Sequence, residues 1–186
     1  ISACLVGSEM CIETGITVLT PSISAIIAIV LAGVLLLASG FASASEIAFF
    51  SLSPSDRNDI DERNHPSDDK ISALLGDTER LLATILITNN FVNVTIIMLC
   101  NFFFMNVFVF HSPLAEFLIL TVILTFLLLL FGEIMPKIYS AQKTLAFCRF
   151  SAPGIYFLEK VFRPIATVLV RSTTFLNKHF VKKSHN

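Results

Sequence analysis

Three long apolar stretches, separated by blocks of charged residues, limit what this chain can fold into. They cover residues 21–52, 81–110 and 114–136, and none of them contains Lys or Arg. A hydrocarbon core of roughly 30 Å needs about 20 apolar residues in a helix, and tilt or a break takes up any excess length. Each stretch therefore predicts a transmembrane helix, with spans at about 22–52, 81–106 and 114–136.

The positions of the basic residues predict how these spans are oriented. No Lys or Arg precedes Arg57, four lie from Arg57 to Arg80, and the other nine lie from Lys137 to Lys183. Lys and Arg of short loops collect on the cytoplasmic side. We therefore expect a cytoplasmic loop at 53–80, an outside N-terminus and a cytoplasmic C-terminus in a multi-pass protein of the cell membrane.

Composition excludes several other classes of protein. Only 15% of the residues are charged and 54% are apolar, whereas soluble domains carry about 25% charged residues. The 18 Phe residues contradict the low hydrophobicity of disordered chains. A net charge of −1 argues against a nucleic-acid partner, which requires a basic field. The predicted fold class is an all-α integral membrane protein in contact with lipid.

The segments outside the spans have weaker signals. Residues 1–20 are predicted to form an outer segment, in which Cys4 and Cys11 form a disulfide or stay free. Ser53 and Pro54 are typical of a helix cap and first helical position, which predicts a short helix over 54–63. The acidic loop around this helix is either a solvated connector or a surface that gathers cations.

Residues 138–183 have apolar clusters spaced by single basic residues. This composition fits amphipathic helices lying at the inner membrane interface. Because proline interrupts helices, we expect Pro153 and Pro164 to divide the segment into pieces of about ten to twenty residues.

Each predicted span contains a polar cluster, and polar groups in a span mark a functional site by default. In the first cluster, residues 39–46, Ser43 and Glu46 are three apart and share a helical face. The alternative is a small-residue packing face, which leaves Glu46 without a partner. In the second, residues 88–93, Asn89 and Asn93 share a face while Asn90 points elsewhere. Their amide oxygens could bind a hard cation, and the alternative is that they only form hydrogen bonds between helices.

The third cluster, residues 132–137, contains a proline. Pro136 has no N–H and therefore leaves the Gly132 carbonyl without its usual donor four residues later. Glu133 places a carboxylate beside that carbonyl. The alternative interpretation is a Glu133–Lys137 ion pair that caps the inner end of the helix.

Together the clusters offer hydroxyl, carboxamide, carbonyl and carboxylate oxygens, with no thiol or imidazole. Such ligands favour hard cations, namely Mg²⁺, Ca²⁺ or Na⁺, and the few formal charges favour weak, exchangeable binding. We therefore expect a cation transporter. A non-transporting membrane scaffold or cation sensor is the second hypothesis. An intramembrane enzyme built on Ser43 would need a nearby base, and no intramembrane His or Lys supplies one.

At these residues the chain resembles the CNNM/CorC family of magnesium transporters, in its cyclin-M-type transmembrane domain. The similarity covers roughly residues 22–183 and rests on three motifs in order. The motifs are Ser43-Ala44-Ser45-Glu46-Ile47-Ala48, Thr88-Asn89-Asn90-Phe91-Val92-Asn93 and Gly132-Glu133-Ile134-Met135-Pro136-Lys137. They are similar to the family's Ser-Gly-Ser-Glu-Thr-Ala, Gly-Asn-Asn-x-Val-Asn and Gly-Glu-Ile-x-Pro-Lys. The chain departs from them at Ala44, Ile47 and Thr88, none of which is a ligand position.

The resemblance implies a homodimer with three membrane helices per subunit and belt-like helices at the inner surface. It implies a largely dehydrated Mg²⁺ between the helices, exchanged against Na⁺ at the same or a nearby site, usually as efflux. Carried over by position, the metal ligands are Ser43, Asn89, Asn93, Glu133 and the Gly132 carbonyl. Cytosolic nucleotide-binding regulatory domains are expected downstream in the full-length chain.

Overall fold

The computed structural model describes residues 16–110 and 112–183, in which the regular elements are helices apart from two three-residue strands. Cys4 and Cys11 lie outside the described residues. The elements, in chain order, are β1 Ile16–Val18, α1 Ile23–Phe50, α2 Pro54–Asp61, α3 Asp68–Leu75, α4 Thr78–Val107, β2 Phe108–Phe110, α5 Pro113–Leu127, the π-helix η1 Leu128–Ile134, α6 Met135–Gln142 and α7 Thr144–Lys183.

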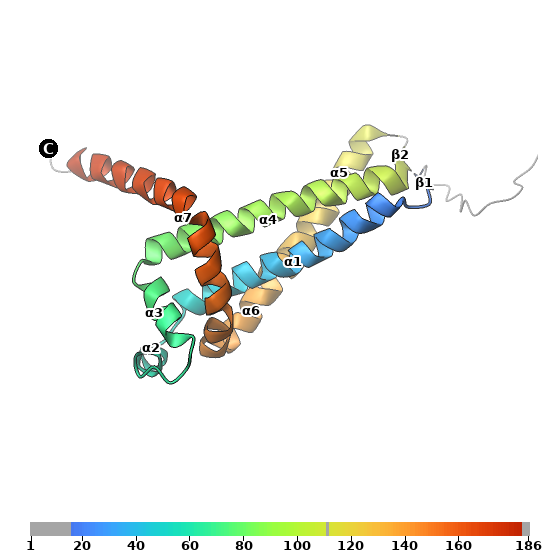
Figure 1. Ribbon diagram of the computed structural model, residues 1–186. Helices are drawn as coiled ribbons and strands as arrows, with labels where there is room; N and C mark the ends of the chain where they lie inside the picture. Colours follow the sequence, from blue (N-terminus) through green and yellow to red (C-terminus); the bar gives the residue numbers. More distant parts are fainter. Residues whose placement is uncertain (1–15, 111, 184–186) are drawn as a thin grey trace, which may run out of the picture.

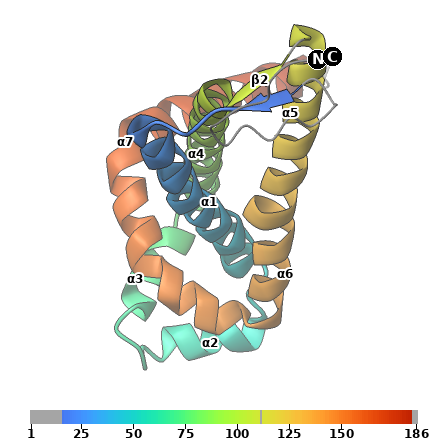
Figure 2. The ribbon, with the colours of Figure 1, turned by 90° about the vertical axis from the view of Figure 1, so that its right-hand side faces the viewer.

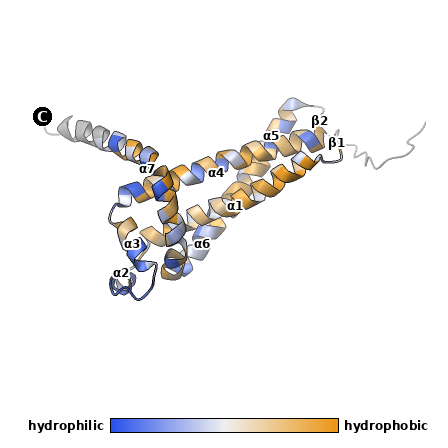
Figure 3. Cartoon of the chain, viewed as in Figure 1, coloured by the Kyte–Doolittle hydropathy of each residue, from blue (hydrophilic) through white to orange (hydrophobic). Residues whose placement is uncertain are grey.

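Three helical runs are long and apolar enough to cross a membrane: Ile23–Phe50, Thr78–Val107 and Pro113–Gln142. The third run consists of α5, η1 and α6 in succession and continues past Pro136. Figure 3 shows the apolar residues concentrated along α1, α4 and α5, whereas α2 is polar and α3 is mixed. The all-α membrane fold with three spans is therefore confirmed.

Helix α1 occupies the middle of the structure and packs against α4, η1, α6 and α7. It begins at Ser22, whose Oγ accepts a hydrogen bond from the Ala25 N–H at 3.3 Å. Small residues allow membrane helices to approach closely, and ten of those in α1 are buried, from its first turn to its last. They are Ala25, Ala28, Ala32, Ser39, Gly40, Ala42, Ser43, Ala44, Ser45 and Ala48.

The two strands join the start of α1 to the connection between α4 and α5. β1 pairs antiparallel with β2, with Ile16 opposite Phe110, and the Leu19 N–H donates to the Val107 carbonyl at 2.7 Å. The sequence did not predict this pair, because three residues are too few to show strand periodicity. The pair lies at one end of the molecule, and α2 and α3 lie at the other (Figure 1). Because the basic residues collect near α2 and α3, we call their end the inner end and the end with the strands the outer end.

The predicted short helix in the acidic loop is confirmed as α2. Ser53 is its cap and forms a capping box, in which its Oγ accepts from the Asp56 N–H and the Asp56 carboxylate accepts from the Ser53 N–H. Below it, Phe49, Ile71, Leu81 and Ile155 form a core that joins α1, α3, α4 and α7. The loop between the first two spans is therefore packed against the membrane helices.

A buried ion pair also joins α3 to α7. Both Asp68 carboxylate oxygens accept hydrogen bonds from Arg149, at 2.9 Å from Nε and 3.1 Å from Nη2, and Asp68 is fully buried. Burial by itself raises the pKa of Asp68, but the bonds from Arg149 and from the His65 N–H outweigh it and lower the pKa below 3.8. The carboxylate is therefore ionised, and it anchors α7.

The prediction that prolines divide the C-terminal segment is wrong. Pro153 and Pro164 both lie inside α7, a single helix of 40 residues. Proline kinks a helix where the neighbouring structure satisfies the freed backbone groups. Figure 2 shows α7 changing direction as it passes around the other helices. The segment is therefore one bent helix at the inner end.

Candidate functional site

Four polar side chains meet between α1 and α4, in the inner halves of these two spans. The Ser39 Oγ donates to the Asn89 Oδ1 at 2.9 Å and lies 2.6 Å from the Asn93 Oδ1. The Ser43 Oγ lies 3.5 Å from the same Asn89 oxygen. Both serines are fully buried and both asparagines are half-buried. We call these four residues the oxygen cluster.

Helical spacing explains why these side chains meet. Ser39 and Ser43 are four residues apart on α1, and Asn89 and Asn93 are four apart on α4, so each pair lies on one helical face. The shared face predicted for Asn89 and Asn93 is confirmed. Asn90 is exposed, and its Nδ2 donates to the Leu86 carbonyl at 2.9 Å. It points away from the cluster, as predicted.

The oxygen cluster has fewer protons than its contacts require. Three contacts of 2.6, 2.9 and 3.5 Å run from hydroxyl oxygens to amide oxygens, but each hydroxyl carries only one proton. Ser39 can donate fully to only one of its two acceptors at a time. The asparagine oxygens therefore keep lone pairs that a cation between α1 and α4 could use.

The third span brings Gly132 to the same place. A Cβ at Gly132 would lie 3.2 Å from the Ser39 Oγ and 3.5 Å from the Leu36 Cδ1, so a larger residue here would push the Ser39 hydroxyl away by a few tenths of an ångström. Glu133 is half-buried and forms no hydrogen bond or ion pair with any residue that the structure describes. The structure therefore places the backbone of Gly132 against the cluster but does not join Glu133 to it.

The backbone around Gly132 is irregular, as a proline at 136 requires. Residues Leu128–Ile134 form a π-helix, and the Met135 N–H donates to the Leu130 carbonyl five residues earlier. Pro136 has no N–H to donate. In a π-helix it would have donated to the carbonyl of Phe131, five residues earlier, and in an α-helix to that of Gly132, four residues earlier. The Phe131 carbonyl lies beside α1, since a Cβ at Gly40 would meet its oxygen at 3.5 Å.

The predicted alternative of a Glu133–Lys137 ion pair is wrong. The Lys137 Nζ instead lies 3.3 Å from the Glu46 Oε2. This pair also corrects the interpretation that Glu46 has no partner. Lys137 follows Pro136, whose ring packs on Gly40 of α1, so the proline directs the lysine towards α1. Glu133 is thereby left without a counter-ion among the described residues.

Ser39 is the member of the cluster that sequence reasoning missed as a ligand. The predicted set took Ser43 as its hydroxyl, but the Ser39 Oγ is the closer of the two to the asparagine oxygens. The signal was present in the sequence, because Ser39 lies one helical turn before Ser43 on the same face.

The chemistry of the cluster suits a hard cation. Within the described ranges, no three His, Cys, Asp or Glu side chains form a group that could hold a metal ion. A metal here would rely on hydroxyl, amide and carbonyl oxygens, which are ligands for Mg²⁺, Ca²⁺ or Na⁺. The ligand roles of Ser43, Asn89, Asn93, Gly132 and Glu133 stay predictions.

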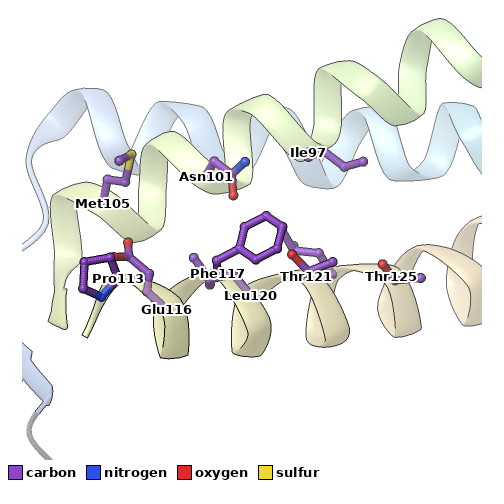
Figure 4. Close-up of a pocket in the computed structure, with 10 residues that line it drawn as sticks. Ile97, Asn101, Met105, Pro113, Glu116, Phe117, Leu120, Thr121 and Thr125 are labelled. Carbon is purple, nitrogen blue, oxygen red and sulfur yellow. The ribbon is translucent and has the colours of Figure 1, made fainter. Parts of the chain in front are cut away.

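A second polar region lies nearer the outer end. A pocket of about 370 Å³ separates α4 from α5 and contains Asn101, Glu116, Thr121 and Thr125 among apolar side chains. Figure 4 shows Asn101 of α4 facing Phe117 and Thr121 of α5. No residue of the oxygen cluster lines this pocket, so the two regions are distinct.

Comparison with known proteins gives one result. A model of the cyclin M transmembrane N-terminal domain family matches residues 29–186. This match includes α1 from its second turn, all of α4 and the π-helix, and thus every residue of the oxygen cluster. No curated protein matches the chain.

Proposed function

The chain belongs to the cyclin M transmembrane family, and from this premise we propose that it carries Mg²⁺ across the cell membrane through the oxygen cluster. The family is associated with metal transport in membranes. The proposed form is a homodimer that exchanges Mg²⁺ for Na⁺ as efflux, with an outside N-terminus and a cytoplasmic C-terminus. Mg²⁺ is the substrate of this protein.

One observation carries the proposal: a single buried hydroxyl, on Ser39, faces the amide oxygens of two asparagines. Hydroxyl and amide oxygens that meet in this way inside a membrane span are the ligands that a hard cation uses.

The proposed ligands are Ser43, Asn89, Asn93, Glu133 and the Gly132 carbonyl, to which we add the Ser39 hydroxyl. Mg²⁺ requires oxygens at about 2.0–2.1 Å in near-octahedral geometry. The asparagine oxygens would therefore turn from Ser39 to the ion, and Glu133, which has no counter-ion among the described residues, would supply the negative charge. One carboxylate among neutral oxygens binds weakly, and a transported ion must leave again.

The proposal is tested by Mg²⁺ flux into or out of liposomes that contain the purified chain. Asn93→Ala removes an oxygen of the cluster and should abolish flux together with Mg²⁺-dependent thermal stabilisation. Glu133→Ala should do the same. Asn90→Ala is the matched control, because that side chain lies on the same helix but outside the cluster. Flux that is unchanged in both Asn93→Ala and Glu133→Ala would refute the site.

The second candidate function is a membrane scaffold or cation sensor that acts on cytosolic domains. The packing of the acidic loop against the spans favours this function, because it gives the spans a direct contact with the loop between them. The liposome experiment separates the two functions. Mg²⁺ binding that depends on Asn93 but occurs without any ion movement would support the sensor.

A further inference from the structure

We propose that Glu46 and Lys137 form the inner gate of the ion pathway: Glu46 is the next ligand of a cation that leaves the oxygen cluster, and the Lys137 ammonium takes its place when the pathway is closed. This inference rests on the proposed function, and it assigns residues outside the predicted ligand set. It starts from the ion pair that the structure shows in place of the expected one.

Glu46 lies on the same face of α1 as the serines of the oxygen cluster. Ser39, Ser43 and Glu46 are four and three residues apart, the spacing of one helical stripe. At 1.5 Å per residue, Glu46 lies about 10 Å from Ser39 towards the inner end. A cation that moves inwards along this stripe would meet the Glu46 carboxylate next.

In the structure, the Lys137 side chain forms an ion pair with the Glu46 carboxylate. Its Nζ lies 3.3 Å from the Glu46 Oε2, and the two side chains are 33% and 28% exposed. An ammonium group at this distance neutralises the carboxylate that an arriving cation would otherwise meet. Partly exposed ion pairs contribute little stability, so an arriving cation can displace the lysine.

Two uncharged contacts beside the ion pair also hold α6 against α1. A Cβ at Gly40 would meet the Pro136 Cγ at 3.0 Å, and the buried Ser140 Oγ donates to the Ala44 carbonyl at 2.6 Å. The helix therefore stays in place without the charges. Only the lysine side chain has to move for the gate to open.

A purely structural ion pair would behave differently from a gate. Glu46→Gln and Lys137→Met both break the pair, so a structural role predicts that they change transport in the same direction. The gate predicts opposite directions, because one variant removes a ligand and the other removes its competitor.

The test measures the initial rate of Mg²⁺ flux in liposomes as a function of the Mg²⁺ concentration. Mg²⁺ is varied on the side of the membrane that faces the inner end of the protein. We expect Lys137→Met to lower the KM for Mg²⁺ by about threefold and Glu46→Gln to raise it by about threefold, the order expected for a half-exposed pair. Lys137→Gln repeats the first variant with a polar side chain. Ser140→Ala, which loosens the same helix contact without changing charge, should leave KM unchanged.

Each outcome decides the inference. Changes in the same direction, no change in either variant, or a Ser140→Ala effect equal to that of Lys137→Met would overturn the gate while leaving Mg²⁺ transport intact. A wild-type chain without flux would overturn the proposed function, and the gate with it. Melting temperatures measured without Mg²⁺ identify any variant that fails to fold. If Lys137→Met fails to fold, Lys137→Gln replaces it.

Discussion

Gly132→Ala should weaken cation binding while leaving the fold almost as stable as before. The added Cβ would lie 3.2 Å from the Ser39 Oγ, 3.5 Å from the Leu36 Cδ1 and 3.8 Å from the Ser39 Cβ. The first contact is closer than ordinary van der Waals contact, which begins at 3.4 Å. The Ser39 hydroxyl must therefore move away from Gly132 by a few tenths of an ångström.

Two terms nearly cancel in the stability of this variant. Overpacking costs about 1 kcal/mol or more, and replacing glycine by alanine inside a helix gains about 1 kcal/mol. The site has no such compensation, because Mg²⁺ demands near-ideal geometry at 2.0–2.1 Å. A loss of about 1–2 kcal/mol in binding lowers the affinity for Mg²⁺ roughly 5- to 30-fold.

The assay is a Mg²⁺ titration of purified protein, followed by melting temperature and by liposome flux. Gly33→Ala is the matched control, because a Cβ at Gly33 meets nothing within 4 Å; it should melt and transport as the wild type does. Gly132→Ala with wild-type Mg²⁺ affinity and flux would show that the close approach of this glycine to Ser39 is unrelated to cation binding.

Three further predictions follow from the contacts of Asp68, Cys148 and Ser39. Asp68→Asn should lower stability by about 2 kcal/mol at pH 7, since it removes a charged hydrogen-bonding partner. The folded-state pKa of Asp68 is lowered, so the stability difference between wild type and variant should shrink as pH falls through that pKa. Melting curves at pH 7 and at pH values below 3.8 measure this difference. A difference that does not change with pH would contradict the ion pair. Burial, followed by the Asp68 charge, raises the pKa of Cys148 to about 12, so maleimide at pH 8 should label it only after unfolding; rapid labelling of folded protein would contradict its burial. Ser39→Ala should reduce Mg²⁺ affinity about as much as Ser43→Ala or more, and a titration in which only Ser43→Ala has an effect would restore the predicted ligand set without Ser39.

Features that depend on neighbouring residues along the chain could be predicted from sequence. The spans follow from apolar length, which the bilayer sets. The Ser53 cap and the shared face of Asn89 and Asn93 follow from spacings of three and four residues. Each of these involves a single helix, so its geometry is contained in the local sequence.

Features that depend on how helices pack could not be predicted in the same way. The partner of Lys137 is Glu46 on another helix, and only the packing of Pro136 on Gly40 brings them together. Likewise, the sequence offers both Ser39 and Ser43 on one face, and the depth at which α4 packs on α1 decides which lies between the asparagines. Pro153 and Pro164 remain inside α7 because tertiary packing outweighs the local cost of proline.

The most direct test of the oxygen cluster is to locate a bound ion. Mn²⁺ accepts the same oxygen ligands as Mg²⁺, and its anomalous scattering marks its position in crystals of the chain. We expect a peak between α1, α4 and Gly132, within about 2.0–2.6 Å of the Asn89 and Asn93 side-chain oxygens, that disappears when excess Mg²⁺ is added. Mn²⁺ bound only elsewhere, with both asparagines still in contact with Ser39, would contradict the account.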